Sequence, residues 1–315
     1  MKSNTDNTGS HRPWLVTHSL SRNDAAAAAA LRSSVAGMKG TFVGTGFRAS
    51  YDGLMENVPA PDGVAFEAAT IAGIPGWWAK PARSRKGGAI LHLHGGWFNW
   101  GSAKAYRHFV GHIASSAGAD AFIPDYRLAP EHQFPAAVTD VEACYRGLLA
   151  GGTARIALTG DSAGGNLALV LLAIASQPAE GGVVPVAAVA FSPVTDLALT
   201  SDSYATRADA EPYFTKSQAA ELVRSYLGDA NPSNALASPL YGDLKGLPPI
   251  RVHVGEDEVL LDDSQRYVEA AVAAGVDARL DVWKGMPHVF VNAIGFDAAK
   301  EALAAVGSFL AERLR

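Results

Sequence analysis

The sequence has only one cysteine, Cys144, among its 315 residues, so no disulfide can form within the chain. A lone thiol is typical of proteins from a reducing compartment, and we expect a cytoplasmic location. The chain also lacks a run of about 18 apolar residues that would span a membrane. Its first twenty residues lack the apolar core of a signal peptide, so we expect none. These absences exclude a disulfide scaffold and predict a protein without a membrane partner.

An excess of basic charge is missing as well. Lys and Arg number 26 against 31 Asp and Glu, which gives a formal net charge of −5. Without a basic stripe, we expect no nucleic-acid partner. Hydrophobic residues make up 48% of the chain and charged residues 18%. At this length, such a composition predicts a globular protein with a large buried core.

Short apolar runs alternate with longer amphipathic stretches along most of the chain. Runs bounded by glycine or charge are typical of buried strands, and they occur at 64–71, 75–80, 88–93, 119–123, 155–159, 186–191, 250–254 and 278–283. Helical stretches separate the later runs, at 103–117, 135–150, 163–177, 263–275 and 297–314. This alternation predicts an α/β fold with a mostly parallel sheet of eight strands, covered by helices on both faces.

Two segments fall outside this alternation. Residues 22–38 contain six consecutive alanines and have high helix propensity, and residues 200–233 are polar and helical between two strands. We expect a single domain over 1–315 with a small helical cap formed by about 1–58 and 200–233. The strand at 278–283 is interpreted as an edge of the sheet, where pairing with a second copy would give a homodimer.

The stretch "GDSAGG" at 160–165 lies between a predicted strand and a predicted helix. It fits the pattern G-x-S-x-G of a nucleophile elbow, in which a sharp turn raises the serine hydroxyl above the sheet. Side chains two positions before and after the serine would collide in such a turn, so Gly160 and Gly164 are required there. We therefore interpret Ser162 as a nucleophile, with the start of the next helix adding positive potential nearby.

A serine hydroxyl needs a base, and the base needs an orienting acid. In this fold the partners follow the serine in the order acid, then histidine. His288 follows the last predicted strand and is the candidate base. The candidate acids follow the strand at 250–254, in the run "GEDEVLLDD"; spacing leaves five of them open: Glu256, Asp257, Glu258, Asp262 and Asp263.

Backbone N–H groups must also stabilise the oxyanion. The run "LHLHGGWFNWGS" at 91–102 leaves a strand and enters a glycine pair, as the donor loop of this fold does. Ala163, directly after the serine, supplies a further N–H group.

Histidines at other positions suggest a metal site at first sight. His92 and His94 alternate along a strand, and His108 and His112 are four residues apart on a helix. No carboxylate or cysteine completes a ligand set beside either pair. We therefore expect neither a metal nor a cofactor.

The chain resembles the hormone-sensitive lipase family of α/β-hydrolases, also called bacterial lipolytic family IV, over about residues 60–315. Four segments carry the resemblance: "HGGWFNWGS" (94–102), "DYRLAPEHQFPAAVTD" (125–140), "GDSAGGNLA" (160–168) and "GEDEVLLDDS" with "GMPHVF" (255–290). The resemblance implies a triad of Ser162, His288 and Glu258, with Asp257 as the alternative acid. It implies oxyanion donors at Gly96 and Trp97, and a serine carboxylesterase that hydrolyses small-molecule esters with short acyl chains.

The chain departs from the family at Trp97, which replaces the third glycine of the usual H-G-G-G segment. The donors are backbone groups, so they survive this change if Trp97 avoids the strain of a positive φ. An indole at this position is expected to exclude esters of large tertiary alcohols. Two other functions stay open: an amide, formamide or lactone hydrolase with the same triad, and a non-catalytic ligand receptor on this fold.

Overall fold

The computed structural model of the protein describes residues 12–177 and 183–315. Within these ranges nine strands form one sheet in the order β1-β9-β8-β7-β6-β4-β5-β3-β2. The strands are β1 Leu15–His18, β2 Val64–Ile71, β3 Ile74–Pro81, β4 Gly88–Leu93, β5 Asp120–Pro124, β6 Arg155–Asp161, β7 Ala187–Phe191, β8 Ile250–Gly255 and β9 Ala278–Trp283. All neighbours from β1 to β5 are parallel, whereas β3 pairs antiparallel with both β5 and β2. The predicted α/β fold with a mostly parallel sheet is confirmed.

The prediction of eight strands was wrong by one, because the first strand was missed. Residues 15–18 form β1, which pairs parallel with β9 from Leu15 opposite Leu280 to His18 opposite Trp283. Its sequence, Leu-Val-Thr-His, does not alternate between apolar and polar residues, so periodicity does not reveal the strand. Side chains hold this strand in place, since His18 stacks on Trp283 with ring centroids 3.7 Å apart.

The strand β9 therefore lies between β8 and β1 and is not an edge of the sheet. The interpretation of 278–283 as an edge that pairs with a second copy was wrong, because β1 already occupies that side. The homodimer prediction loses the surface on which it was based.

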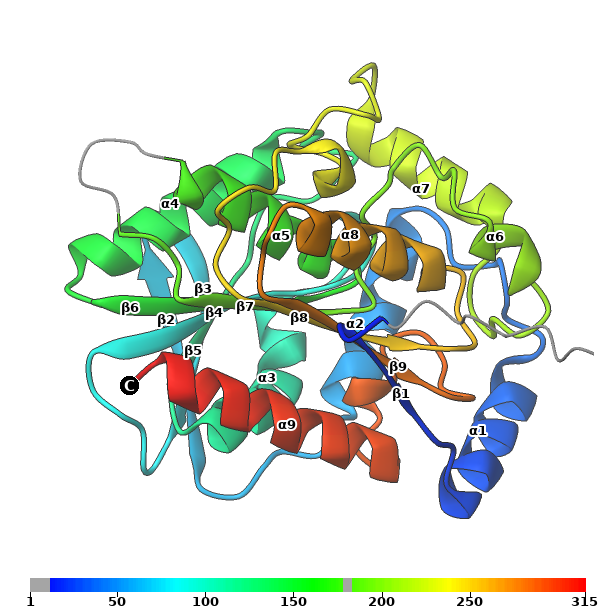
Figure 1. Cartoon of the computed structure of the whole chain (residues 1–315), viewed down its shortest axis with the longest axis horizontal. Helices are drawn as coiled ribbons and strands as arrows, with labels where there is room; N and C mark the ends of the chain where they lie inside the picture. The colour runs from blue at the N-terminus through cyan, green and yellow to red at the C-terminus, as the bar shows by residue number, and fades with distance from the viewer. Residues whose placement is uncertain (1–11, 178–182) are drawn as a thin grey trace, which may run out of the picture.

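Helices cover both faces of the sheet. Figure 1 shows α4, α5 and α8 above the sheet and α3 and α9 below it. Both faces of the central strands are buried, which explains why β4 and β7 are buried at every position. The helices are α1 Arg22–Val35, α2 Arg48–Glu56, α3 Ala103–Ala117, α4 Ala136–Ala150, α5 Ala163–Ser176, α6 Ser203–Thr206, α7 Lys216–Leu227, α8 Leu261–Ala273 and α9 Asp297–Arg313.

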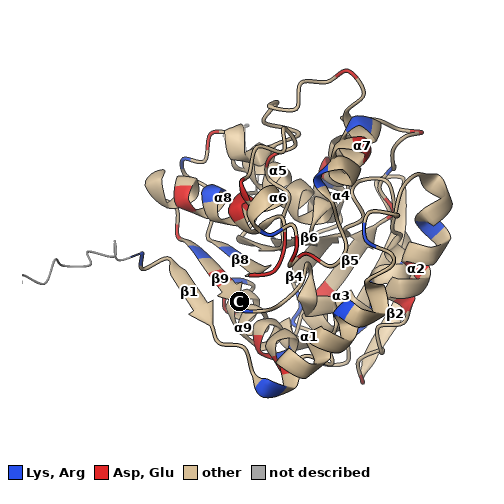
Figure 2. Cartoon of the chain, turned by 90° about the vertical axis from the view of Figure 1, so that its right-hand side faces the viewer, with Lys and Arg blue, Asp and Glu red and all other residues tan. Residues whose placement is uncertain are grey.

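Two segments outside the regular alternation meet at one end of the central strands. Figure 2 shows α6 and α7 on one side, and α1 and α2 on the other side, of the ends of β4 and β6. The helix α2 was not predicted, because its sequence is polar and contains Gly53. Residues 1–11, which the sequence assigns to the predicted cap, lie outside the described residues.

Acidic and basic residues are mixed along the part of the chain that faces the viewer in Figure 2. The coloured ribbon shows positions of Lys and Arg interspersed with positions of Asp and Glu. Of the helices in residues 12–177 and 183–315, none combines the length and apolar character needed to cross a membrane.

Candidate active site

Ser162 lies in the turn that joins β6 to α5, at the carboxyl ends of the central strands. Its backbone is strained, with φ 54° and ψ −119°. A Cβ atom added at Gly160 would lie 2.2 Å from the carbonyl oxygen of Gly164, and one added at Gly164 would lie 1.9 Å from that of Leu93. Both glycines are required by close backbone approach, as the sequence predicted.

His288 reaches Ser162 from the loop that follows β9. Its Nε2 atom lies 3.0 Å from Ser162 Oγ, within hydrogen-bond distance. The side chains of both residues are almost fully buried, with His288 at 8% and Ser162 at 4% exposure. The next residue, Val289, adopts a left-handed conformation with φ 50°, so a second strained residue lies beside the site.

Glu258 is the acid that contacts His288. Its Oε2 atom lies 2.6 Å from His288 Nδ1, and its Oε1 atom accepts hydrogen bonds from Gly255 N and Ser192 Oγ, both at 2.7 Å. Asp257 instead forms a 2.5 Å ion pair with Arg32 on α1. Glu258 is fully buried, so three hydrogen bonds satisfy its charge and hold it against the imidazole.

The other acids of the run have separate structural roles. Asp262 accepts a hydrogen bond from Ser203 N at 2.7 Å, and Asp263 accepts one from Thr195 N at 2.7 Å. The backbone N–H of Glu256 donates to Trp283 O at 2.9 Å. These contacts bind the loop to its neighbours and do not involve His288.

The surroundings of His288 favour its protonated form. Burial lowers the pKa of His288, but the negative charges of Glu258, Glu211 and Asp161 raise it, and the net direction is upward. The largest of the raising effects is that of Glu258, in direct contact. The imidazole is therefore more basic than an ordinary histidine.

The loop after β4 approaches Ser162 from the neighbouring strand. Asp161, beside the serine, accepts a hydrogen bond from Gly95 N at 3.1 Å and one from Tyr106 Oη at 3.1 Å. In the described part of the chain, the backbone N–H groups of Gly96 and Trp97 donate to no protein acceptor. Ala163 begins α5, where an N–H group has no intrahelical acceptor. These three N–H groups are therefore free of protein acceptors in the described residues.

Trp97 does not avoid a positive φ as the sequence interpretation required. Its φ is 52° and that of Phe98 is 60°, in the region that favours glycine. Such a conformation costs about 1–3 kcal/mol. The indole is only 1% exposed and packs edge-on against Phe214, with ring centroids 5.6 Å apart, so its burial offsets the strain.

Ser192 is a site residue that sequence reasoning missed. It follows β7, donates its hydroxyl hydrogen to Glu258 and accepts a hydrogen bond from Val289 N at 3.1 Å. It also has a positive φ of 47°. The hydroxyl thus links the loop of the acid to the loop of the histidine. No local pattern signals this contact, because the three residues come from distant segments.

A pocket of about 480 Å³ opens above Ser162 and His288. Its walls are mostly apolar and include Trp97 and Trp100 of the loop after β4. The remaining walls come from the N-terminal segment, from residues before α7 and from the loop after β9, among them Leu31, Tyr51, Met55, Tyr213, Phe214 and Ile294. The pocket volume falls within the usual range for small-molecule sites.

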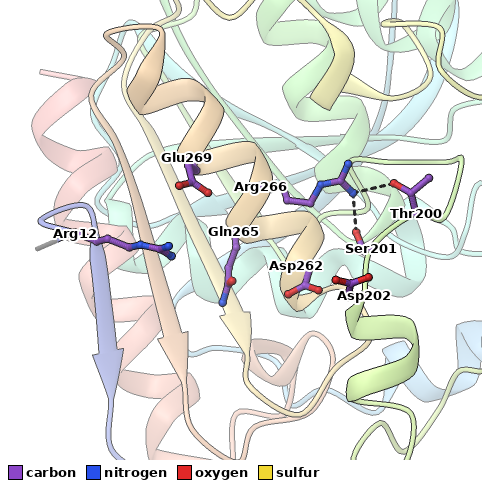
Figure 3. A pocket seen from close by; sticks show the side chains of 8 residues that line it. All are labelled: Arg12, Thr200, Ser201, Asp202, Asp262, Gln265, Arg266 and Glu269. Carbon is purple, nitrogen blue, oxygen red and sulfur yellow. Dashed lines mark hydrogen bonds between the residues drawn. The ribbon is translucent and has the colours of Figure 1, made fainter. Parts of the chain in front are cut away.

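A second hollow, of about 340 Å³, lies beside the first turns of α8. Figure 3 shows Arg266 of α8 directed at Thr200 and Ser201, and it donates to both hydroxyls at 3.1 Å. Arg266 also pairs with Asp196 at 3.0 Å. Arg266, Thr200 and Ser201 are thus already engaged with one another at the start of the 200–233 segment. Of the candidate acids Asp262 lines this hollow, whereas Ser162, His288 and Glu258 do not.

The histidines considered as metal ligands have other contacts. His92 Nδ1 lies 2.9 Å from Thr159 Oγ1, and His94 Nδ1 lies 2.8 Å from Gly95 O. His108 and His112 each contact a backbone carbonyl of the chain after α2, at 2.9 and 2.8 Å. Throughout the described ranges, no group of three or more His, Cys, Asp or Glu side chains is arranged to hold a metal ion.

Cys144 is buried in α4, and burial raises the pKa of its thiol to about 12. A thiol that stays protonated is a poor nucleophile, so Cys144 acts as a packing residue.

Comparison with known proteins identifies the fold and the relatives. Residues 90–292 match a family model described as alpha/beta hydrolase fold. An acetyl-hydrolase from Streptomyces hygroscopicus is 38% identical over 248 residues, which cover 77% of this chain and 81% of that protein. An esterase from Acinetobacter venetianus is 35% identical, covering 82% of this chain and 86% of the relative.

A solved structure gives the most specific comparison. The crystal structure of an esterase from the bacterial hormone-sensitive lipase family is 38% identical, with a TM-score of 0.87 over 94% of this chain and 99% of the other. Ser162, Glu258 and His288 lie in two of the segments that carried the resemblance in the sequence, and Gly96 and Trp97 lie in a third. The chain therefore belongs to the hormone-sensitive lipase family of α/β-hydrolases.

Proposed function

We propose that this protein is a serine carboxylesterase that hydrolyses small esters with short acyl chains. The observation that carries the proposal is the continuous chain of contacts from Ser162 Oγ through His288 to Glu258, at 3.0 and 2.6 Å. Ser162, His288 and Glu258 are the nucleophile, base and acid of this mechanism. No cofactor is required, because each of its steps uses these side chains, backbone N–H groups and water.

The reaction begins when Ser162 attacks the ester carbonyl. With its proton on Nδ1, donated to Glu258, the imidazole of His288 accepts the serine proton at Nε2. Glu258 stabilises the resulting imidazolium and keeps the ring in the correct tautomer. The upward shift of the pKa of His288 strengthens it as a base.

The negative charge that develops on the carbonyl oxygen is stabilised by backbone groups. We assign this oxyanion hole to the N–H groups of Gly96, Trp97 and Ala163. Asp161 holds the donor loop in place through Gly95 N, so the donors are oriented before substrate binds.

The intermediate then collapses with loss of the alcohol. His288 returns its proton to the departing alkoxide, which leaves an acyl group on Ser162. A water molecule deprotonated by His288 attacks this acyl-enzyme. The bond from the acyl carbon to Ser162 Oγ then breaks, His288 returns the proton to Oγ, and the carboxylic acid is released.

The size of the acyl group is inferred from the pocket and from the relatives. Trp97 and Phe214 narrow the space beside Ser162. One relative is named an acetyl-hydrolase, which agrees with a short acyl chain. We propose that residues 1–58 and 200–233 form a cap over a single hydrolase domain, since α1, α2 and the residues before α7 line the pocket.

Amide, formamide and lactone hydrolysis use the same groups and form the second candidate function. The contact of His288 with Ser162 argues against a ligand receptor, in which the hydroxyl would need no base. A panel of p-nitrophenyl esters, a lactone and a formamide decides between these activities. We expect p-nitrophenyl acetate and butyrate to have the highest kcat/KM, and Ser162→Ala to abolish turnover. Preference for the formamide or the lactone would refute the ester assignment.

The cytoplasmic location stays a prediction. Fractionation of cells that express the chain, followed by detection of esterase activity, tests it directly.

A further inference from the structure

The mechanism above leaves one buried carboxylate beside the triad unused. Glu211 lies in the segment between α6 and α7 and is only 1% exposed. Carboxylates are almost never buried to this extent without partners that satisfy them. The contacts of Glu211 therefore indicate what this buried carboxylate does.

Glu211 joins the 200–233 segment to the loop of the triad acid. One carboxylate oxygen, Oε1, accepts a hydrogen bond from Tyr213 N at 2.8 Å, and the other, Oε2, accepts one from Val259 N at 3.1 Å. Val259 directly follows Glu258. A single side chain thus fixes the backbone next to the acid and the backbone of the segment above the pocket.

The residue after Tyr213 is the one that contacts the base. The ring of Phe214 stands edge-on to His288, with centroids 5.4 Å apart and an interplanar angle of 85°. Phe214 also lines the pocket above Ser162. The hydrogen bond from Tyr213 N to Glu211 therefore controls where this wall of the pocket lies.

We propose that Glu211 is a positioning residue of the catalytic centre, which holds Phe214 against His288 and stabilises the imidazolium as a second buried negative charge. The inference rests on the proposed esterase function. Glu211 touches neither substrate nor nucleophile, so it acts through His288 and Phe214.

The charges around Glu211 agree with this role. Burial and the charge of Glu258 raise the pKa of Glu211, while His288 and the two backbone hydrogen bonds lower it, and the net result is a pKa of about 6. Glu211 is therefore ionised at pH 7 and raises the pKa of His288 in return. The charged and titratable groups near this pair are Glu258, Asp161, Tyr204, Tyr213, Arg32, Arg207 and Asp257.

Glu211→Gln removes the charge and keeps the shape. We expect the midpoint of the acidic limb of kcat/KM to move to lower pH by roughly 0.5 unit, because one negative charge beside His288 is lost. We also expect kcat at the optimum to fall about threefold, because a shift of roughly 0.5 unit in the pKa corresponds to that loss of imidazolium stabilisation. The matched control is Glu221→Gln, an exposed glutamate on α7, which should keep the wild-type profile.

Glu211→Asp keeps the charge and shortens the reach. The acidic limb of its kcat/KM profile should keep the wild-type midpoint. Its KM should rise several-fold, because the pocket wall formed by Phe214 becomes less well fixed. If Glu211→Gln fails to fold, Glu211→Asp still tests the proposal. Wild-type values of kcat and KM in Glu211→Asp would overturn the positioning role.

The outcomes separate this inference from the proposed function. If the wild-type enzyme hydrolyses esters but the acidic limb of the kcat/KM profile of Glu211→Gln keeps the wild-type midpoint, only the role of Glu211 is overturned. A wild-type protein without hydrolase activity overturns the proposed function and this inference with it.

Discussion

Trp97 offers the sharpest test of how the pocket selects substrates. Its indole lines the pocket beside Ser162, and its Nε1 atom is buried without a hydrogen-bond partner among the described residues. Substitution therefore removes packing and bulk but no hydrogen bond. We expect Trp97→Gly and Trp97→Ala to accept esters of tertiary alcohols that the wild type excludes.

The magnitude follows from two opposing effects. Loss of a buried tryptophan costs about 3–5 kcal/mol of stability, and this cost should apply in full to Trp97→Ala, which keeps the φ of 52°. Glycine adopts that φ without strain, so Trp97→Gly should recover about 1–2 kcal/mol of the loss. A pocket contact of this kind changes discrimination by about 1–3 kcal/mol, so the selectivity ratio should rise about tenfold or more.

The assay compares kcat/KM for tert-butyl acetate with kcat/KM for ethyl acetate in four proteins: wild type, Trp97→Gly, Trp97→Ala and Trp97→Phe. Urea denaturation gives the stability of each. The Trp97→Phe variant keeps an aromatic ring and should keep the wild-type ratio. An unchanged ratio in both the glycine and the alanine variants would refute the assignment of Trp97 as the steric barrier.

Three further predictions concern the triad and its support. Glu258→Gln should lower kcat by roughly 10³–10⁴-fold. Asp257→Asn loses only a partly exposed ion pair with Arg32, so its kcat should stay within a few-fold of the wild-type value in the same assay. A larger loss of kcat in Asp257→Asn than in Glu258→Gln would make Asp257 the acid. Ser192→Ala removes a hydrogen bond to a buried carboxylate worth about 1.5–3 kcal/mol and should lower kcat/KM about 10- to 100-fold, and wild-type kinetics would show that the hydroxyl is dispensable. The pKa of His288 is raised and the base must be neutral, so kcat/KM should increase with pH through a midpoint above about 6.5; a flat profile from pH 5 to 8 would mean that His288 is not the base.

Local patterns were sufficient to predict the turn that carries Ser162 and much of the sheet. Gly160, Ser162 and Gly164 form one short turn, and their spacing encodes the steric requirement that the structure shows. Eight of the nine strands were recognisable, because six are mostly apolar parallel strands and the antiparallel β2 and β3 are each eight residues long. The exception, β1, is only four residues long and depends on contacts with β9, such as His18 on Trp283.

The supporting residues could not be predicted, because their partners are distant in the chain. Ser192 meets Glu258 across 66 residues, and Glu211 meets Val259 across 48. Spacing within the acid run likewise left five candidates, and only the folded loop directs Glu258 toward His288 and Asp257 toward Arg32. Sequence patterns relate residues that are close along the chain, whereas these contacts join residues that only the packing of the fold brings together.

The central claim is that Ser162 becomes covalently acylated during turnover. Intact-protein mass spectrometry of the enzyme mixed with a slowly deacylated p-nitrophenyl ester tests this most directly, with peptide mapping to locate the added mass. We predict one acyl group per chain on Ser162 in the wild type and none in Ser162→Ala. An acyl group on another residue, or full ester hydrolysis by Ser162→Ala, would contradict the account.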